Sequence, residues 1–116
     1  MHTITLPWPP SANSIWRSVG GRNVASEGYR AWKRTAGLEL MVQRPKKHLG
    51  PVSVEIRLSP PDRRRYDLDN RVKPLLDALV TGGIIEGDDT RIVRRIVVEL
   101  GDGDPGACVT ISEAVT

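Results

Sequence analysis

The chain of 116 residues contains no phenylalanine and only one cysteine, Cys108. A single cysteine excludes an internal disulfide and a zinc site built from several cysteines, and it fits a reducing compartment such as the cytoplasm. Aromatic residues make up only 4% of the chain, so isoleucine, leucine and valine, with three tryptophans, must fill the core. Because no apolar run is long enough for a signal peptide or a membrane span, we expect no membrane association.

Length and charge set broad limits on the protein. The hydrophobic fraction of 39% over 116 residues is enough for one core, which predicts a single domain spanning residues 1–116. Lysine and arginine number 17 against 14 aspartates and glutamates, giving a formal net charge of +3. The pI near 9.4 is therefore a mild bias towards anionic partners such as nucleic acid.

Hydrophobic periodicity predicts strands and helices in the order β-α-β-α-β-β. Strands are expected over residues 3–6, 52–59, 92–100 and 107–112, and helices from Ser26 to about Arg44 and from about Arg71 to Gly82-Gly83. The apolar positions expected to face the core are Ile4, Leu6, Tyr29, Trp32, Ala36, Leu40, Val52, Val54, Ile56, Leu58, Leu68, Val72, Leu75, Leu76, Leu79, Ile92, Ile96, Val98, Leu100, Val109 and Ile111. This pattern predicts an α+β domain, a mixed sheet with two helices that closes with a hairpin at residues 101–106.

Two early segments interrupt this pattern. Residues 7–13 hold three prolines around Trp8. Two interpretations are possible: a rigid connector in which Trp8 covers the core, which we favour, and a loop that lines the substrate surface. Residues 15–24 are basic and contain Gly20-Gly21, which predicts a mobile loop. Whether that loop becomes ordered on a phosphate backbone or is simply solvated is left open by the sequence.

The most unusual stretch is residues 60–73, where three arginines precede two aspartates and a lysine follows one helical turn later. Arginines position a polyanion, and carboxylates hold a divalent metal ion against it. A second acidic pair farther along the chain would complete the metal site. The predicted ligands are Asp67, Asp69, Asp89 and Asp88, and the lysine is Lys73, which would stabilise developing negative charge or steer the phosphate. The stretch therefore predicts a small magnesium-dependent nuclease acting on DNA.

Pro74 limits where the second helix can begin, because proline is tolerated in a first turn and costs about 3 kcal/mol in a helix interior. Either the regular helix starts near Arg71 or it kinks at Pro74. A start near Arg71 leaves residues 67–69 in non-helical backbone. Since residues two apart point the same way only in extended chain, the carboxylates of Asp67 and Asp69 would then converge on one ion.

Simpler interpretations exist for single aspartates, which often cap helices or form surface pairs with lysine. Asp62 and Asp77 fit that description. For Asp67, Asp69 and Asp89 together, the simpler interpretation would require clustered like charges with no ion to offset them.

The chain resembles the RusA family of phage-type Holliday junction resolvases over nearly its whole length. The motifs that carry the resemblance, in order and spacing, are Leu6-Pro7-Trp8-Pro9-Pro10-Ser11, Pro61-Asp62-Arg63-Arg64-Arg65, Asp67-Leu68-Asp69-Asn70, Lys73, Asp77-Ala78-Leu79 and Asp88-Asp89. The resemblance implies a homodimeric endodeoxyribonuclease that needs Mg²⁺ or Mn²⁺ and nicks four-way DNA junctions in recombination and repair. A twofold dimer would supply two identical sites for two symmetric cuts.

The resemblance also implies residue roles. Asp67, Asp69 and Asp89 match the essential carboxylates, with Asp88 beside them, and Lys73 matches the important lysine. The predicted DNA-binding set is Arg63, Arg64, Arg65, Tyr66, Arg71 and Lys73. Tyr66 departs from the family's basic run, and stacking on a base or sugar is the role we expect for it. The alternatives are a non-catalytic protein that binds branched DNA and a nuclease for flaps or forks.

Overall fold

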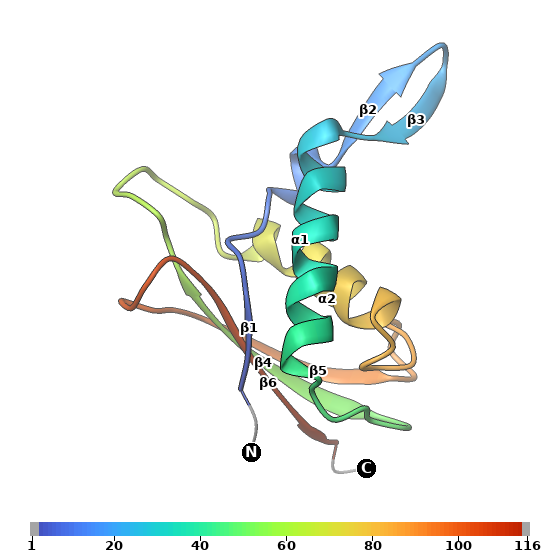
Figure 1. Cartoon of the computed structure of the whole chain (residues 1–116), viewed down its shortest axis with the longest axis vertical. Coiled ribbons are helices and arrows are strands. Elements are labelled where there is room, and N and C mark those ends of the chain that lie inside the picture. The colour runs from blue at the N-terminus through green and yellow to red at the C-terminus, as the bar shows by residue number, and fades with distance from the viewer. Residues whose placement is uncertain (1–2, 115–116) are drawn as a thin grey trace.

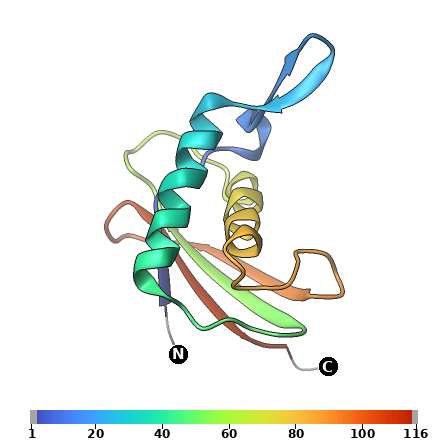
Figure 2. The same cartoon turned by 45° about the vertical axis from the view of Figure 1, so that its right-hand side comes forward.

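The computed structural model describes residues 3–114 as two layers, with both α-helices on one face of a four-stranded sheet (Figures 1 and 2). The elements are β1 (Thr3–Leu6), β2 (Trp16–Val19), β3 (Arg22–Ala25), α1 (Glu27–Gln43), β4 (Val52–Ser59), α2 (Val72–Thr81), β5 (Val93–Leu100) and β6 (Gly106–Glu113). The main sheet has the order β1-β6-β4-β5, and β2 pairs only with β3. Since parallel and antiparallel pairs occur in one sheet, the predicted α+β class with a mixed sheet is confirmed.

Helix α1 begins and ends where the sequence predicts. The Ser26 hydroxyl accepts a hydrogen bond from the backbone N–H of Tyr29 at 3.2 Å, which caps the first turn. At the other end Arg44 has a φ of 48°, a left-handed conformation, and Pro45 follows. The buried side chains of α1 are Tyr29, Trp32, Ala36 and Leu40, the four predicted from helical spacing.

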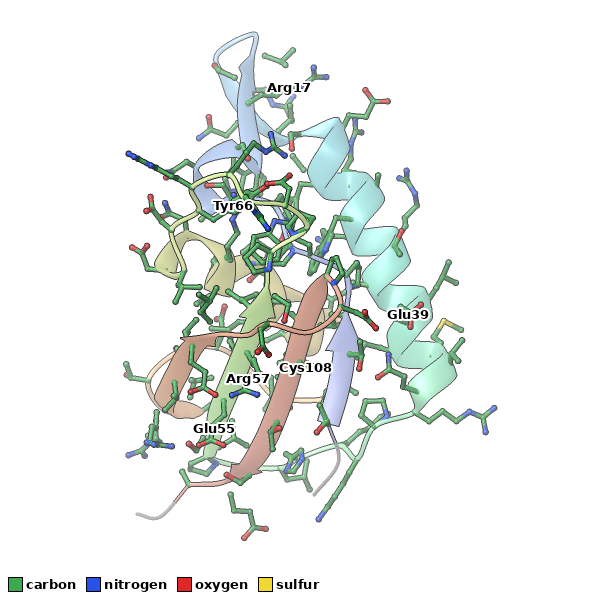
Figure 3. All side chains as sticks on the ribbon, turned by 90° about the vertical axis from the view of Figure 1, so that its left-hand side faces the viewer. Arg17, Glu39, Glu55, Arg57, Tyr66 and Cys108 are labelled. Atoms are coloured by element: carbon green, nitrogen blue, oxygen red, sulfur yellow. The ribbon has the colours of Figure 1, made fainter. Side chains whose placement is uncertain are left out.

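Strand β4 lies at the centre of the sheet, between β6 and β5. Its apolar residues Val52, Val54, Ile56 and Leu58 are at most 1% exposed, as the strict alternation predicts. They pack beneath the helices with Ile4 and Leu6 of β1 and Val109 of β6, so one hydrophobic core joins the two layers. Cys108 points to the opposite, open face of the sheet with Glu55 and Arg57 (Figure 3).

Helix α2 starts at Val72, which places Pro74 in its first turn and confirms a helix start near Arg71. Leu75 and Leu79 are fully buried, as predicted from their helical stripe. However, Leu68 has right-handed helical dihedrals and residues Asp69–Arg71 form a 3₁₀ turn. The expectation that Asp67 and Asp69 converge through extended backbone is therefore wrong. A tight turn leads directly into α2, because Arg71 N–H donates to the Leu68 carbonyl at 3.2 Å.

The closing hairpin expected at residues 101–106 is not formed, because β5 and β6 lie on opposite sides of β4. β5 pairs with β4 in parallel, after the α2 crossover, and β6 pairs with β4 in antiparallel. The Gly101 N–H donates to the Leu58 carbonyl at 2.7 Å, and the following loop then crosses the end of β4. Alternation of apolar residues identifies the buried face of a strand but not its neighbour, so the sequence pattern did not distinguish these arrangements.

The segment predicted as a mobile loop, residues 15–24, is instead largely a β-hairpin. β2 and β3 pair from Trp16↔Ala25 to Val19↔Arg22, leaving a two-residue turn at Gly20-Gly21. Both glycines have positive φ, 57° and 78°, as a tight hairpin turn of this length requires. The hairpin projects away from both layers beyond the start of α1 (Figure 1).

Strand β5 forms one edge of the sheet, opposite β1, and is less buried than predicted. Ile92 precedes the strand, and Val93 takes the inward position at 8% exposed because the register shifts beside Val52. Ile96 and Leu100 are 44% and 64% exposed, since the edge strand receives less cover than β4. Neither α-helix found between residues 3 and 114 has the length and apolar content needed to cross a bilayer.

Candidate active site

The basic loop after β4 is organised around Asp62. The carboxylate of Asp62 accepts hydrogen bonds from the backbone N–H of Arg64 at 2.9 Å and from the Tyr66 hydroxyl at 2.9 Å. The Arg64 guanidinium also pairs with it, at 3.0 Å from Nη2 to Oδ2. These bonds, above all that from the Arg64 side chain, lower the pKa of Asp62 to about 2. Asp62 therefore stabilises the loop and pairs with an arginine, where the sequence suggested a helix cap or a surface pair with lysine.

Arg63 and Arg65 differ from Arg64 in this loop. Both are exposed, and no ion pair within residues 3–114 involves either of them. Their guanidinium groups are therefore available for an external anion, whereas that of Arg64 already has a carboxylate partner.

Arg71 is packed inside an aromatic cluster. Its guanidinium carbon lies 5.3 Å from the Trp8 ring centroid and 5.1 Å from that of Tyr66, and Nη1 donates to the Pro9 carbonyl at 2.8 Å. Trp8 and Tyr66 meet edge to face at 5.0 Å. The cluster joins the proline-rich segment to the basic loop, which agrees with a rigid connector in which Trp8 packs against the core. DNA contacts by Arg71 and Tyr66 stay predictions.

Lys73 sits in a chain of polar contacts that begins in the core. The Tyr29 hydroxyl on α1 donates to Asp77 Oδ2 at 3.0 Å. Asp77 Oδ1 lies 3.1 Å from Lys73 Nζ, one turn back along α2, and Lys73 Nζ in turn lies 2.6 Å from Asp88 Oδ2. The sequence spacing predicted the pair of Lys73 and Asp77, but the link to Tyr29 is visible only in the fold.

These polar contacts shift the pKa values of the residues that they join. The hydrogen bond to Asp88, followed by the contact with Asp77, raises the pKa of Lys73, so its ammonium stays protonated. The same bond lowers the pKa of the Asp88 carboxyl. Burial, followed by the hydrogen bond to Asp77, raises the pKa of Tyr29, which keeps its hydroxyl as a neutral donor.

The predicted metal ligands Asp67 and Asp69 are exposed at the entrance to α2. Asp67 accepts one long contact from the Asn70 amide at 3.5 Å, and Asp69 opens the 3₁₀ turn. Asp69 is four residues before Lys73, which places both on the amino-terminal side of α2. Lys73 also contacts Asp88 of the second acidic pair, at 2.6 Å.

The carboxylate of Asp89 is paired with the side chain of Arg91. Its carboxylate accepts from the Arg91 backbone N–H at 2.9 Å and lies 2.8 Å from Arg91 Nη2, and these bonds lower the pKa of Asp89. Its carbonyl accepts from the N–H groups of Ile92 and Val93, so Asp89 also shapes the turn into β5. The Arg91 side chain is 86% exposed, and such a surface pair is weak enough to exchange for a stronger ligand.

The chemistry of the predicted ligands suits a divalent cation. Asp67, Asp69 and Asp89 offer only carboxylate oxygens, which a hard ion such as Mg²⁺ prefers. Within residues 3–114, however, no three acidic, histidine or cysteine side chains lie close enough together to enclose an ion. Magnesium sites often take few protein ligands and leave the rest to water and phosphate oxygens, so exposed carboxylates of this kind suit an ion shared with a nucleic-acid backbone.

A depression of about 330 Å³ lies beside Lys73. Its lining includes Lys33 and Tyr29 of α1, Asp77 of α2, Asp88 and, from the hairpin, Trp16. Trp16 is not among the site residues predicted from the sequence. The signal that would have found it is the Gly20-Gly21 pair, because a two-residue glycine turn between polar and β-branched residues predicts a hairpin.

Comparison with known proteins identifies the family to which the chain belongs. The sequence profile of the family described as Endodeoxyribonuclease RusA matches residues 7–112. The chain is 38% identical over 103 residues to the crossover junction endodeoxyribonuclease RusA of Escherichia coli strain K12, covering 85% of this chain and 82% of the relative.

Two further relatives carry the same description. The protein from Enterobacteria phage 82 is 38% identical over 101 residues, covering 84% of this chain and 81% of its own. That from Shigella sonnei is 36% identical over 102 residues, covering 85% and 82%. The phage relative agrees with a phage-type origin for this group of proteins. The chain belongs to the RusA family of endodeoxyribonucleases.

Proposed function

We propose that this chain is an endodeoxyribonuclease that resolves four-way DNA junctions by metal-dependent hydrolysis of phosphodiester bonds. The observation that carries the proposal is the family match over residues 7–112, since the curated relatives are crossover junction endodeoxyribonucleases. The arrangement of Lys73, exposed carboxylates and a basic loop around one end of α2 supports it, because these groups are what phosphoryl chemistry on DNA needs.

Asp67, Asp69 and Asp89 are the residues that would hold the cation, for which we propose Mg²⁺, with Mn²⁺ as a substitute. When bound, such an ion lowers the pKa of an attacking water and offsets negative charge on the phosphate oxygens. Asp89 would release Arg91 to take part, and the exposure of that pair supports the exchange. Asp88 is also a candidate ligand, but its contact with Lys73 at 2.6 Å favours a role in positioning the lysine.

Lys73 is the residue proposed to act on the phosphate directly. Its ammonium has three N–H donors, and Asp77 and Asp88 accept two of them. The third donor is free to contact a phosphate oxygen. Since the raised pKa keeps Lys73 protonated, the group would stabilise the negative charge that grows on that oxygen as the bond to phosphorus forms.

The proposed substrate and assembly follow from the same role. Arg63 and Arg65 would bind backbone phosphates, with Arg64 restrained by Asp62. We propose a homodimer, because two cuts in strands of like polarity need two sites related by a twofold axis. The proposed location is the cytoplasm, where bacterial and phage DNA is recombined.

A junction-cleavage assay tests the proposal. Synthetic four-way, three-way and linear duplexes would be incubated with the protein in Mg²⁺ or in EDTA. We expect paired, ligatable nicks in opposing arms of the four-way junction, in Mg²⁺ only. Asp69→Asn should bind the junction and fail to cut it, because it removes a ligand charge but not the DNA surface. Glu39→Gln, which removes a carboxylate from the exposed side of α1, is the matched control and should cut normally.

Other outcomes distinguish the alternatives. Normal cutting by Asp69→Asn would remove that residue from the metal site. Binding without cutting under any divalent ion would indicate a non-catalytic protein that recognises branched DNA. A single nick restricted to a flap or fork would make the substrate a different branched structure.

A further inference from the structure

The hairpin of β2 and β3 is a projecting arm that carries positive charge only. Residues 16–25 include Arg17 and Arg22 and no acidic residue. None of the ten is buried, and Trp16 and Val19 are 56% and 50% exposed. A two-stranded ribbon is marginally stable alone in water, so an arm of this kind gains from a partner that covers it.

The base of the arm is fixed to the body of the protein. Ile15, which precedes β2, is 3% exposed, and its carbonyl accepts the Ser26 N–H at 2.8 Å. Ser26 is also the N-terminal cap of α1, so the arm leaves the body at the start of that helix. The Gly20-Gly21 turn then closes the ribbon with two residues. The arm is therefore held in a defined direction and is not a free loop.

The two faces of the ribbon differ in the side chains that they present. Alternation and the pairing register place Trp16, Ser18, Asn23 and Ala25 on one face and Arg17, Val19, Arg22 and Val24 on the other. Trp16 meets Tyr29 edge to face, with ring centroids 6.5 Å apart. It also lines the depression that contains Lys73, Asp77 and Asp88. The exposed indole therefore lines the same depression as the proposed phosphate-binding lysine.

We propose that this hairpin is a DNA-binding arm in which Trp16 stacks on a nucleobase beside the phosphate at Lys73, while Arg17 and Arg22 contact backbone phosphates. The inference rests on the proposed function. An exposed aromatic ring accepts any base, and bases at a branch point can leave the duplex stack to reach it. The absence of acidic residues along residues 16–25 complements a polyanion.

The first test is binding of Trp16→Ala and Trp16→Phe to a four-way junction in EDTA, where cutting does not interfere. We expect about tenfold weaker binding for Trp16→Ala and nearly normal binding for Trp16→Phe, which keeps an aromatic plane. Leu49→Ala is the control, because it truncates an 84% exposed apolar side chain in the loop after α1. A 2-aminopurine base placed at the branch point should lose fluorescence on binding wild type and lose less on binding Trp16→Ala.

The second test measures how junction binding depends on salt. Replacing both Arg17 and Arg22 by Ala should reduce the slope of log K against log salt by about 1.8, since each phosphate contact contributes about 0.9. Replacing Lys46 and Lys47 by Ala removes the same charge beyond the other end of α1 and should leave the slope near the wild-type value. Circular dichroism of each variant checks that it is folded.

The outcomes separate this inference from the proposed function. The proposal that the hairpin binds DNA would be overturned by unchanged affinity and 2-aminopurine signal in Trp16→Ala together with an unchanged salt slope in the arginine pair. This holds even if wild type resolves junctions. If wild type binds junctions but never cuts them, the nuclease proposal fails, while the binding measurements still show whether the hairpin binds DNA. Should Trp16→Ala prove unfolded, Trp16→Phe and the arginine pair carry the decision.

Discussion

Lys73 and the three aspartates Asp67, Asp69 and Asp89 belong to one proposed site, but the protein holds them in different ways. Lys73 is fixed between two carboxylates, one of which is bonded to the buried hydroxyl of Tyr29. The aspartates are exposed: Asp67 accepts one long contact from the Asn70 amide, and Asp89 pairs with the exposed Arg91. One half of the site is prearranged by the core, and the other half is open.

The difference follows from charge. Carboxylates repel one another, and gathering three of them without a cation would raise their pKa values and cost free energy. Exposed positions avoid that cost until a cation and phosphate arrive. A lysine between two carboxylates has the opposite balance, because each contact stabilises its charged form. The fold therefore fixes Lys73 in advance and leaves the proposed acidic ligands exposed.

The largest effect is expected on the cleavage rate, from Lys73→Met, which keeps the length of the side chain and removes the ammonium. We expect the cleavage rate to fall about 100-fold, a loss typical of removing one donor that stabilises a transition state. Junction affinity should fall far less. Single-turnover cleavage under saturating enzyme measures the rate apart from binding.

Lys47→Met is the matched control, since it makes the same change in an exposed loop after α1. Equal losses of rate in the two variants would mean that Lys73 has no special part in the chemistry. A loss of affinity equal to the loss of rate would make Lys73 a binding group only.

A smaller effect is expected on stability from Tyr29→Phe, which breaks the contact between the core and Asp77. We expect a loss of about 1 kcal/mol in the free energy of unfolding at neutral pH, the usual value of one hydrogen bond. Urea unfolding measures it. Tyr66→Phe is the control, because its hydroxyl bonds to the exposed Asp62 and its loss should cost less.

The raised pKa of Tyr29 predicts that the free energy of unfolding depends on pH in the alkaline range. Its pKa in the folded protein is raised above the ordinary 10.0, so its stabilising contribution is complete below pH 10 and is lost as pH rises beyond that value. Unfolding free energy between about pH 9 and pH 11 should therefore fall less steeply in Tyr29→Phe than in wild type. Parallel curves would show that Tyr29 titrates normally.

The smallest effect is expected within the basic loop. Arg65→Ala should lower the salt slope of junction binding by about 0.9, whereas Arg64→Ala should lower it less, because Arg64 is held by Asp62. Filter binding across a range of salt concentrations measures both slopes. Identical slopes for the two variants would show that DNA releases Arg64 from its carboxylate.

Several features of this fold are local and were predicted correctly. The cap at Ser26, the stop before Pro45 and the four buried side chains of α1 depend only on helical spacing and backbone limits. The start of α2 follows likewise from what Pro74 cannot do. The β2–β3 hairpin was missed although its Gly20-Gly21 turn is also a local signal. The exposed basic residues of that segment are also typical of a solvated loop, so the turn signal alone separates the two structures.

By itself the sequence determined the α+β class and the buried face of each inner strand, and it supplied the residues proposed to hold a cation and to bind DNA, because period, propensity and side-chain chemistry are properties of neighbouring residues. Only the tertiary structure decided that β6 lies between β1 and β4, that Tyr29 bonds to the Asp77 that pairs with Lys73, and that Trp16 lines the same depression. Those contacts join residues far apart in the chain. Their geometry is set by the packing of α1 and α2 on the sheet, which no local pattern encodes.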